Sequence, residues 1–135
     1  MPRLALALLA LLLPAAAHAQ WPRSVEARLT REYQRCQNSG DAAKGVTLAM
    51  RECQGAEIER QDARLNQAYV MVVRRLPASR KAALRQSERG WIATRDRACR
   101  QAADRFEGGT MAPLEYGGCY LRRTIERTLW LERYR

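Results

Sequence analysis

The chain has 135 residues, of which 24 are Lys or Arg and 14 are Asp or Glu, giving a formal net charge of +10. This length suits one modest domain, and the charge favours anionic partners in general without naming one. The single His lies at position 18, which excludes Ser–His and Cys–His nucleophile pairs from the rest of the chain.

The first nineteen residues have the features of a secretory signal peptide. Arg3 supplies a positive charge, residues 4–13 are an unbroken run of Leu and Ala, and Ala17-His18-Ala19 fits the small-x-small cleavage rule. The run is too short for a permanent membrane span, and a buried first helix is the alternative. No twin-Arg pair precedes the run and no Cys stands directly after the cleavage point. We therefore expect an exported, soluble periplasmic or secreted chain that starts at Gln20 without a lipid anchor there.

Residues 22–36 are predicted to form a short amphipathic helix. Pro22 suits a helix start, and Val25, Leu29, Tyr33 and Cys36 fall on one face of such a helix. The sequence Asn-Ser-Gly-Asp at residues 38–41 then predicts a turn.

Two long helices are predicted over residues 47–75 and 77–106, folded back on each other at Leu76-Pro77. Pro77 breaks the first helix and suits the first turn of the second, and Thr47 can cap the first. Each helix carries a stripe spaced by four and three residues, which predicts one packed face. The first stripe is Ile58, Asp62, Leu65, Tyr69, Val72 and Leu76, and the second is Leu84, Glu88, Trp91, Arg95, Ala98 and Ala102.

The remainder is predicted to be a loop and a last helix. Residues 107–110 read Glu-Gly-Gly-Thr, Gly117-Gly118 interrupts the next segment, and a helix runs from Cys119 to Tyr134. Strand hairpin signals are missing. We therefore predict an all-α single domain over residues 20–135, consisting of a long antiparallel helical hairpin with a short helix packed at each end and two disulfides.

Four cysteines follow the predicted signal peptide: Cys36, Cys53, Cys99 and Cys119. An even number in an exported protein predicts disulfides. A zinc site is the alternative, but closely paired ligands are missing. Cys53 lies about 140° around its helix from the stripe, so it is expected to face the first helix. The expected pairs are Cys36–Cys53 and Cys99–Cys119, with Cys53–Cys99 and Cys36–Cys119 as the alternative. No metal or cofactor is expected.

Asp62 and Arg95 are charged residues on stripes that should be apolar. In the hairpin they lie about 3 Å out of level along the axis, so Arg95 can reach the carboxylate. We predict that this pair forms a structural lock that is costly to break from one side. Asn66 and Asp96 neighbour the stripes and, with Trp91, are candidate members of the lock. The alternative is that both charged side chains sit in water at the rim.

Four short motifs carry a resemblance to one known family. They are Asp62-x-x-Leu65-Asn66-x-x-Tyr69, Trp91-Ile92-x-x-Arg95-Asp96-x-x-Cys99, Gly108-Gly109-Thr110, and Cys119 followed by Thr124-x-x-Arg127. In this order and spacing, the chain resembles the secreted lysozyme-inhibitor LprI-like family from about residue 36 to 127. The resemblance implies a small exported α-helical domain with disulfides, and one characterised member inhibits lysozyme. This chain departs from the family at Glu88, where the family usually has Gln, and lacks the lipid-anchor Cys.

Catalysis is not expected, and no catalytic residue is predicted. Glu57, Glu59 and Glu88 are available as the two carboxylates of a glycoside hydrolase. Such residues are routine on solvated helix faces, however, and no convergent constellation is visible.

The predicted hairpin tip is strongly basic. Five of the twelve residues from 74 to 85 are cationic and none is acidic: Arg74, Arg75, Arg80, Lys81 and Arg85. These side chains are a candidate surface for an anionic envelope polymer or lipid surface. A solubilising surface on an Arg-rich protein is the alternative.

Two functions are therefore expected. The first is an exported protein-binding module whose partner is lysozyme or another envelope protein, such as a peptidoglycan hydrolase. Losing Arg3 would leave a charge of +9, which a cationic lysozyme would repel, unless a local acidic patch formed by Glu52, Glu57, Glu59 and Asp62 overcomes it. The second is a cationic periplasmic protein that binds anionic envelope components without inhibiting anything. Nucleic acid is not an expected partner, and the oligomeric state does not follow from the sequence.

Overall fold

The computed structural model describes residues 21–135, so the predicted signal peptide lies outside the described residues. The described part contains helices and no strands, which confirms the all-α prediction. The helices are α1 (Arg23–Glu26), α2 (Arg31–Gln37), α3 (Gly40–Ala43), α4 (Thr47–Arg75), α5 (Ala78–Asp104) and α6 (Met111–Arg133). Over residues 21–135, no helix combines the length and apolar character needed to cross a bilayer.

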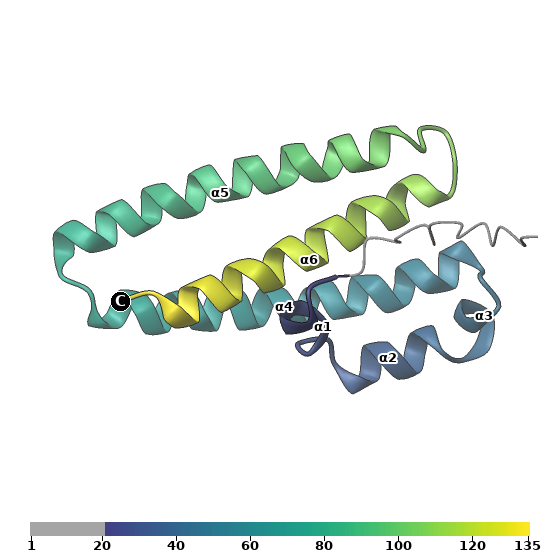
Figure 1. The fold of residues 1–135 in the computed structure, drawn as a ribbon, viewed down its shortest axis with the longest axis horizontal. Helices are drawn as coiled ribbons and strands as arrows, with labels where there is room; N and C mark the ends of the chain where they lie inside the picture. Colours follow the sequence, from purple (N-terminus) through teal and green to yellow (C-terminus); the bar gives the residue numbers. More distant parts are fainter. Residues whose placement is uncertain (1–20) are drawn as a thin grey trace, which may run out of the picture.

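The two predicted long helices, α4 and α5, form an antiparallel hairpin that turns at Leu76 and Pro77 (Figure 1). They do not pack directly on each other as expected. Instead, α6 packs extensively against both, while α4 and α5 make few contacts with each other. The two stripes therefore lie on either side of a third long helix.

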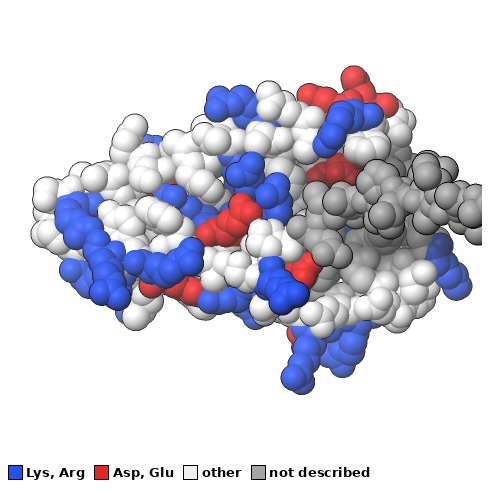
Figure 2. Space-filling model, viewed as in Figure 1, with Lys and Arg blue, Asp and Glu red and all other residues white. Residues whose placement is uncertain are grey.

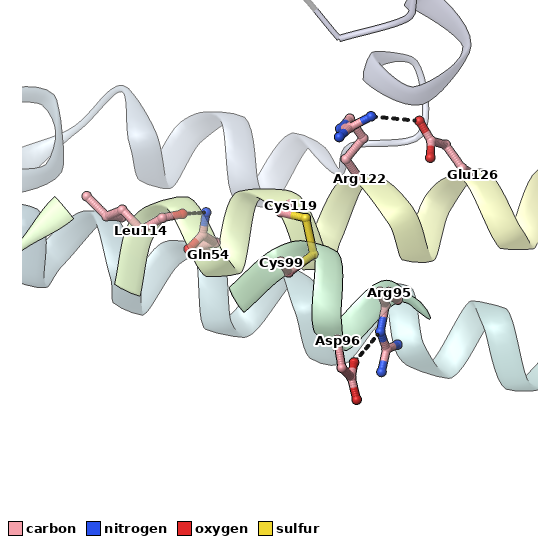
Figure 3. Close-up of a disulfide and its surroundings, with 8 residues drawn as sticks. All are labelled: Gln54, Arg95, Asp96, Cys99, Leu114, Cys119, Arg122 and Glu126. Carbon is pink, nitrogen blue, oxygen red and sulfur yellow. Dashed lines mark hydrogen bonds and ion pairs between the residues drawn. A yellow bond between two sulfur atoms is a disulfide. The ribbon is translucent and has the colours of Figure 1, made fainter. Parts of the chain in front are cut away.

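The last helix is longer than predicted, because α6 begins at Met111 instead of Cys119 and continues through Gly117. That glycine is buried against α4, where a Cβ atom would collide with the side chain of Gln54. Gln54 donates a hydrogen bond to the Leu114 carbonyl at 3.2 Å (Figure 3). Gly117 therefore permits close approach of two helices and does not end one. The expected loop is present before α6, where Gly108 has a φ of 76° that favours glycine.

Two apolar clusters hold the helices together. One joins α4, α5 and α6 near the hairpin turn, and consists of Leu65, Val72, Leu76, Leu84 and Leu131. The other joins α1 to α6 and is formed by Val25, Leu121 and Ile125. Burying a side chain of this size contributes about 1.5–3 kcal/mol. Of the 27 residues of α5, only Leu84, Arg95 and Cys99 are buried, so α5 depends on few contacts.

The predicted first helix is broken into α1 and α2 by Thr30. The Thr30 hydroxyl accepts a hydrogen bond from the Tyr33 amide at 3.1 Å, which caps α2. The same hydroxyl and the Thr30 amide donate to the Glu57 carboxylate of α4, at 2.5 and 3.0 Å. The short helix α3 overlaps the predicted turn, and Val46 in place of Thr47 precedes α4 without a side-chain cap.

Both expected disulfides are present. Cys36–Cys53 joins α2 to α4 with a Cα–Cα distance of 5.7 Å, and Cys99–Cys119 joins α5 to α6 at 5.3 Å (Figure 3). These two pairs show that the alternative pairing is wrong, and residues 21–135 contain no free cysteine. The same residues contain no group of three His, Cys, Asp or Glu side chains placed to hold a metal ion.

Candidate functional site

A groove of about 360 Å³ opens between α4 and α5, with α6 at its base. Its walls are built largely from the two predicted stripes, because α6 holds those faces apart. The lining residues are Asp62, Leu65, Asn66 and Tyr69 of α4, Glu88, Trp91, Ile92 and Arg95 of α5, and Tyr120 of α6. The site thus combines three aromatic rings, two aliphatic side chains and charges of both signs.

Arg95 forms an ion pair and contacts two aromatic rings. Its side chain is only 8% exposed, and its Nε donates to the Asp96 carboxylate at 2.9 Å (Figure 3). The guanidinium carbon lies 3.8 Å from the centre of the Tyr120 ring and 4.9 Å from that of Trp91. Cation–π contacts of this kind are favourable, and more so when they are shielded from water. Arg95 therefore joins α5 to α6.

The predicted ion pair between Asp62 and Arg95 is not formed. Tyr120 links the two residues instead, because its hydroxyl donates to Asp62 Oδ2 at 3.2 Å while Arg95 lies over its ring. This arrangement follows from the position of α6 between the helices that carry the two charges. Of the other candidate members of the lock, Asp96 and Trp91 contact Arg95, whereas Asn66 is exposed at the rim of the groove.

Asp62 is an incompletely compensated carboxylate. Burial raises the pKa of its carboxyl group above 3.8, and the hydrogen bond from Tyr120 and the charge of Arg95 oppose that rise only in part. A perturbed carboxylate in a concave site is a common property of functional residues, although structural networks also produce it.

Glu88, by contrast, has an ion-pair partner. Its Oε1 accepts hydrogen bonds from Nε and a terminal nitrogen of Arg127, at 2.9 and 2.5 Å. The Arg127 guanidinium lies 3.7 Å from the centre of the Trp130 ring and 5.6 Å from that of Trp91. The seam between α5 and α6 is thus a guanidinium–aromatic ladder, which we define as Tyr120, Arg95, Trp91, Arg127 and Trp130.

Sequence reasoning missed the structural role of Glu57. This residue was a candidate for an acidic surface patch, but it is fully buried. Besides the two bonds from Thr30, it accepts from Gln61 at 2.8 Å and from Arg60 at 2.9 Å. Burial raises the pKa of Glu57, but these hydrogen bonds outweigh burial and lower it overall. The signal available in the sequence was the presence of donors three and four residues later on one helix.

The five candidate cations of the hairpin tip are not equivalent. Figure 2 shows Lys and Arg side chains gathered at the end of the molecule where α4 turns into α5. Arg75 and Arg80 donate to the carbonyl groups of Tyr134 and Arg135, so they bind the two residues that follow α6. The other three, Arg74, Lys81 and Arg85, make no side-chain hydrogen bond or ion pair with another residue of the 21–135 region.

Comparisons with known proteins cover the whole groove. A family model described as "Lysozyme inhibitor LprI" matches residues 36–131, from the end of α2 nearly to the end of α6. Among curated proteins, the chain is 30% identical over 106 residues to the uncharacterized protein R02472 of Rhizobium meliloti (strain 1021), an alignment that covers 68% of this chain and 76% of that protein. No solved structure matches the chain.

Proposed function

The chain belongs to the lysozyme inhibitor LprI family, and from that premise we propose that it is an exported protein-binding module that inhibits a lysozyme or another peptidoglycan hydrolase. The groove between α4 and α5 is the proposed contact site. One observation carries the proposal: most residues of the two long family motifs line this groove, namely Asp62, Leu65, Asn66, Tyr69, Trp91, Ile92 and Arg95.

The demands of folding do not account for all of these residues. Leu65 and Arg95 are buried and stabilise the fold, but Asn66 is exposed and Ile92 is 42% exposed. Asp62 has no ion-pair partner among the described residues, so the partial burial of its carboxylate lowers the stability of the fold. A concave site with apolar walls and a few polar groups is the usual form of a binding site, so the groove supports recognition.

The carboxylates support binding over catalysis. Glu57 is buried and hydrogen-bonded, and Glu88 is paired with Arg127. The pair of accessible carboxylates that glycoside hydrolysis requires is therefore not available from these two residues. An inhibitor needs only to cover the cleft of its target.

The test is the clearing of a bacterial suspension by lysozymes of several classes, with and without the purified, oxidised protein. We expect at least one lysozyme to be inhibited, and the inhibition to survive moderate salt because a desolvated contact is screened less than an exposed one. Ile92→Arg should weaken inhibition about tenfold or more, because it places a long side chain with an unpaired positive charge in the contact.

Met71→Arg is the matched control for this experiment. Met71 is 62% exposed on α4 and lies outside the groove, so the same charge should leave inhibition unchanged there. Equal losses in the two variants, or no inhibition of any lysozyme by the unaltered protein, would count against the proposal.

A second function is favoured by the hairpin tip. Arg74, Lys81 and Arg85 present charges that no described acidic group neutralises, and residues 74–85 contain no acid. These cations suit an anionic envelope polymer or lipid surface. Salt-sensitive binding to envelope fractions without inhibition of any lysozyme would support this second function.

A further inference from the structure

We propose that the groove receives a Lys or Arg side chain of the partner protein, with the Asp62 carboxylate as its counter-ion. This inference rests on the proposed function and specifies the chemistry of the partner at that site. It starts from the charges around the groove. Three carboxylates lie in or beside it, and two of them already have a guanidinium: Glu88 pairs with Arg127, and Asp96 pairs with Arg95.

The third carboxylate, Asp62, has no ion-pair partner among residues 21–135. It accepts one hydrogen bond from a neutral phenol, that of Tyr120. Taking Asp62, Glu88 and Asp96 against Arg95 and Arg127, the charge around the groove is −1, in a chain whose net charge is +10. A partly buried charge without a partner is unfavourable, so one incoming cation would complete the site.

The walls of the groove match the rest of a long cationic side chain. Leu65 and Ile92 provide apolar contacts for the methylene groups, which basic side chains bury readily. The ring of Tyr69 carries no guanidinium from the described part of the chain, whereas those of Trp91 and Tyr120 lie under Arg95. Tyr69 is therefore the ring that can face the incoming cation.

A basic partner also removes the difficulty raised by the overall charge. Two cationic proteins repel each other at long range, but specificity is set where the surfaces meet. The groove gives a cationic lysozyme a complementary contact of short range.

The test uses three short peptides and a sugar as probes. We would titrate the oxidised protein with acetyl-Gly-Arg-Gly-amide, acetyl-Gly-Lys-Gly-amide and the neutral citrulline peptide, and separately with chitotriose, and follow the Trp91 indole N–H signal by NMR. We expect saturable shifts with the two cationic peptides and none with the neutral peptide. Asp62→Asn should weaken the binding about tenfold.

Two further variants keep this test decisive. Asp104→Asn removes the same charge at an exposed position at the end of α5, outside the groove, and should bind the cationic peptides as the unaltered protein does. Asn66→Arg introduces a guanidinium four residues after Asp62 on an exposed position of α4, where it can pair with that carboxylate. It should fold normally and lose peptide binding.

Several outcomes would overturn the inference. They are the absence of a saturable shift, an equal shift with citrulline, unchanged binding by Asp62→Asn, or a shift with chitotriose alone, which would indicate a saccharide site. Its failure is separable from that of the proposed function. If lysozyme is inhibited equally by the unaltered protein and by Asp62→Asn, only the inference falls. If the peptides bind through Asp62 and no lysozyme is inhibited, only the inhibitor function falls.

Discussion

Two carboxylates on α4, Glu57 and Asp62, lie little more than one helical turn apart, and their pKa values are shifted in opposite directions. Glu57 accepts bonds from Thr30, Gln61 and Arg60, and these donors compensate its burial. Asp62 accepts bonds from Tyr120 alone among the described residues, and its pKa is raised. The first carboxylate therefore anchors the N-terminal helices. The second lowers the stability of the protein at neutral pH, but it places a negative charge in the groove.

The role of Glu57 gives a prediction about stability. Glu57→Gln should lower the free energy of unfolding by about 2 kcal/mol, because an amide cannot accept all of these bonds and leaves buried donors unsatisfied. Chemical denaturation at pH 7 measures this change. Glu59→Gln, at an exposed position on the same helix, is the control, and a similar loss in both variants would rule out a special role for Glu57.

The same carboxylate makes stability depend on pH. Because folding lowers its pKa from 4.5, Glu57 contributes stability that is present above pH 4.5 and is lost as the pH falls through the folded value. The pKa of Asp62 is raised, so its contribution has the opposite sign and is lost as the pH rises. The difference in stability between the unaltered protein and Glu57→Gln should therefore shrink below pH 4.5, and a constant difference would contradict this assignment.

At the scale of elements, α5 is the least embedded of the long helices. It buries Leu84 at one end and Cys99 near the other, and between them it relies on the guanidinium–aromatic ladder. Its contacts are mostly with α6, and the Cys99–Cys119 disulfide fixes that pairing. A helix with so little apolar burial should depend strongly on a covalent link.

We therefore expect the double variant Cys99→Ala/Cys119→Ala to loosen α5 selectively. Opening a loop of this size costs about 3 kcal/mol in the chain-entropy model. Amide hydrogens of α5 should then exchange faster than those of α4 when followed by mass spectrometry. In the matched variant Cys36→Ala/Cys53→Ala, faster exchange should be confined to α2 and α3. Uniform acceleration across all helices in both variants would show that the disulfides act on global stability alone.

The sequence predicted the hairpin and both disulfides because those features depend on local rules. Pro77 fixes the turn, and the angular position of Cys53 on its helix selects Cys36 as its partner. The position of α6 depends on tertiary packing, and no local sequence pattern predicts it. Gly117 suggested a helix interruption because its contact with Gln54 is not visible in the sequence. Most residues of the groove were identified, but as a packed seam, because the helix between its walls was expected to be short.

At the scale of the whole molecule, charge and shape divide the surface into two regions. The groove is locally negative, whereas the end with the hairpin turn is positive. The two regions use different residues, so the inhibitor function and the anionic-surface function can be separated by mutation. Near an anionic membrane, each cation contributes about 1 kcal/mol to binding.

The tip can be tested with the triple variant Arg74→Gln/Lys81→Gln/Arg85→Gln. At low salt it should bind vesicles of phosphatidylglycerol and phosphatidylethanolamine about a hundredfold more weakly than the unaltered protein in a sedimentation assay. The matched variant Arg31→Gln/Arg51→Gln/Arg100→Gln removes the same charge from exposed positions away from the tip, so it should lose much less. If both variants lose affinity equally, net charge alone governs the binding, and the tip is only a solubilising surface. Lysozyme inhibition should persist in both variants, because neither changes the groove.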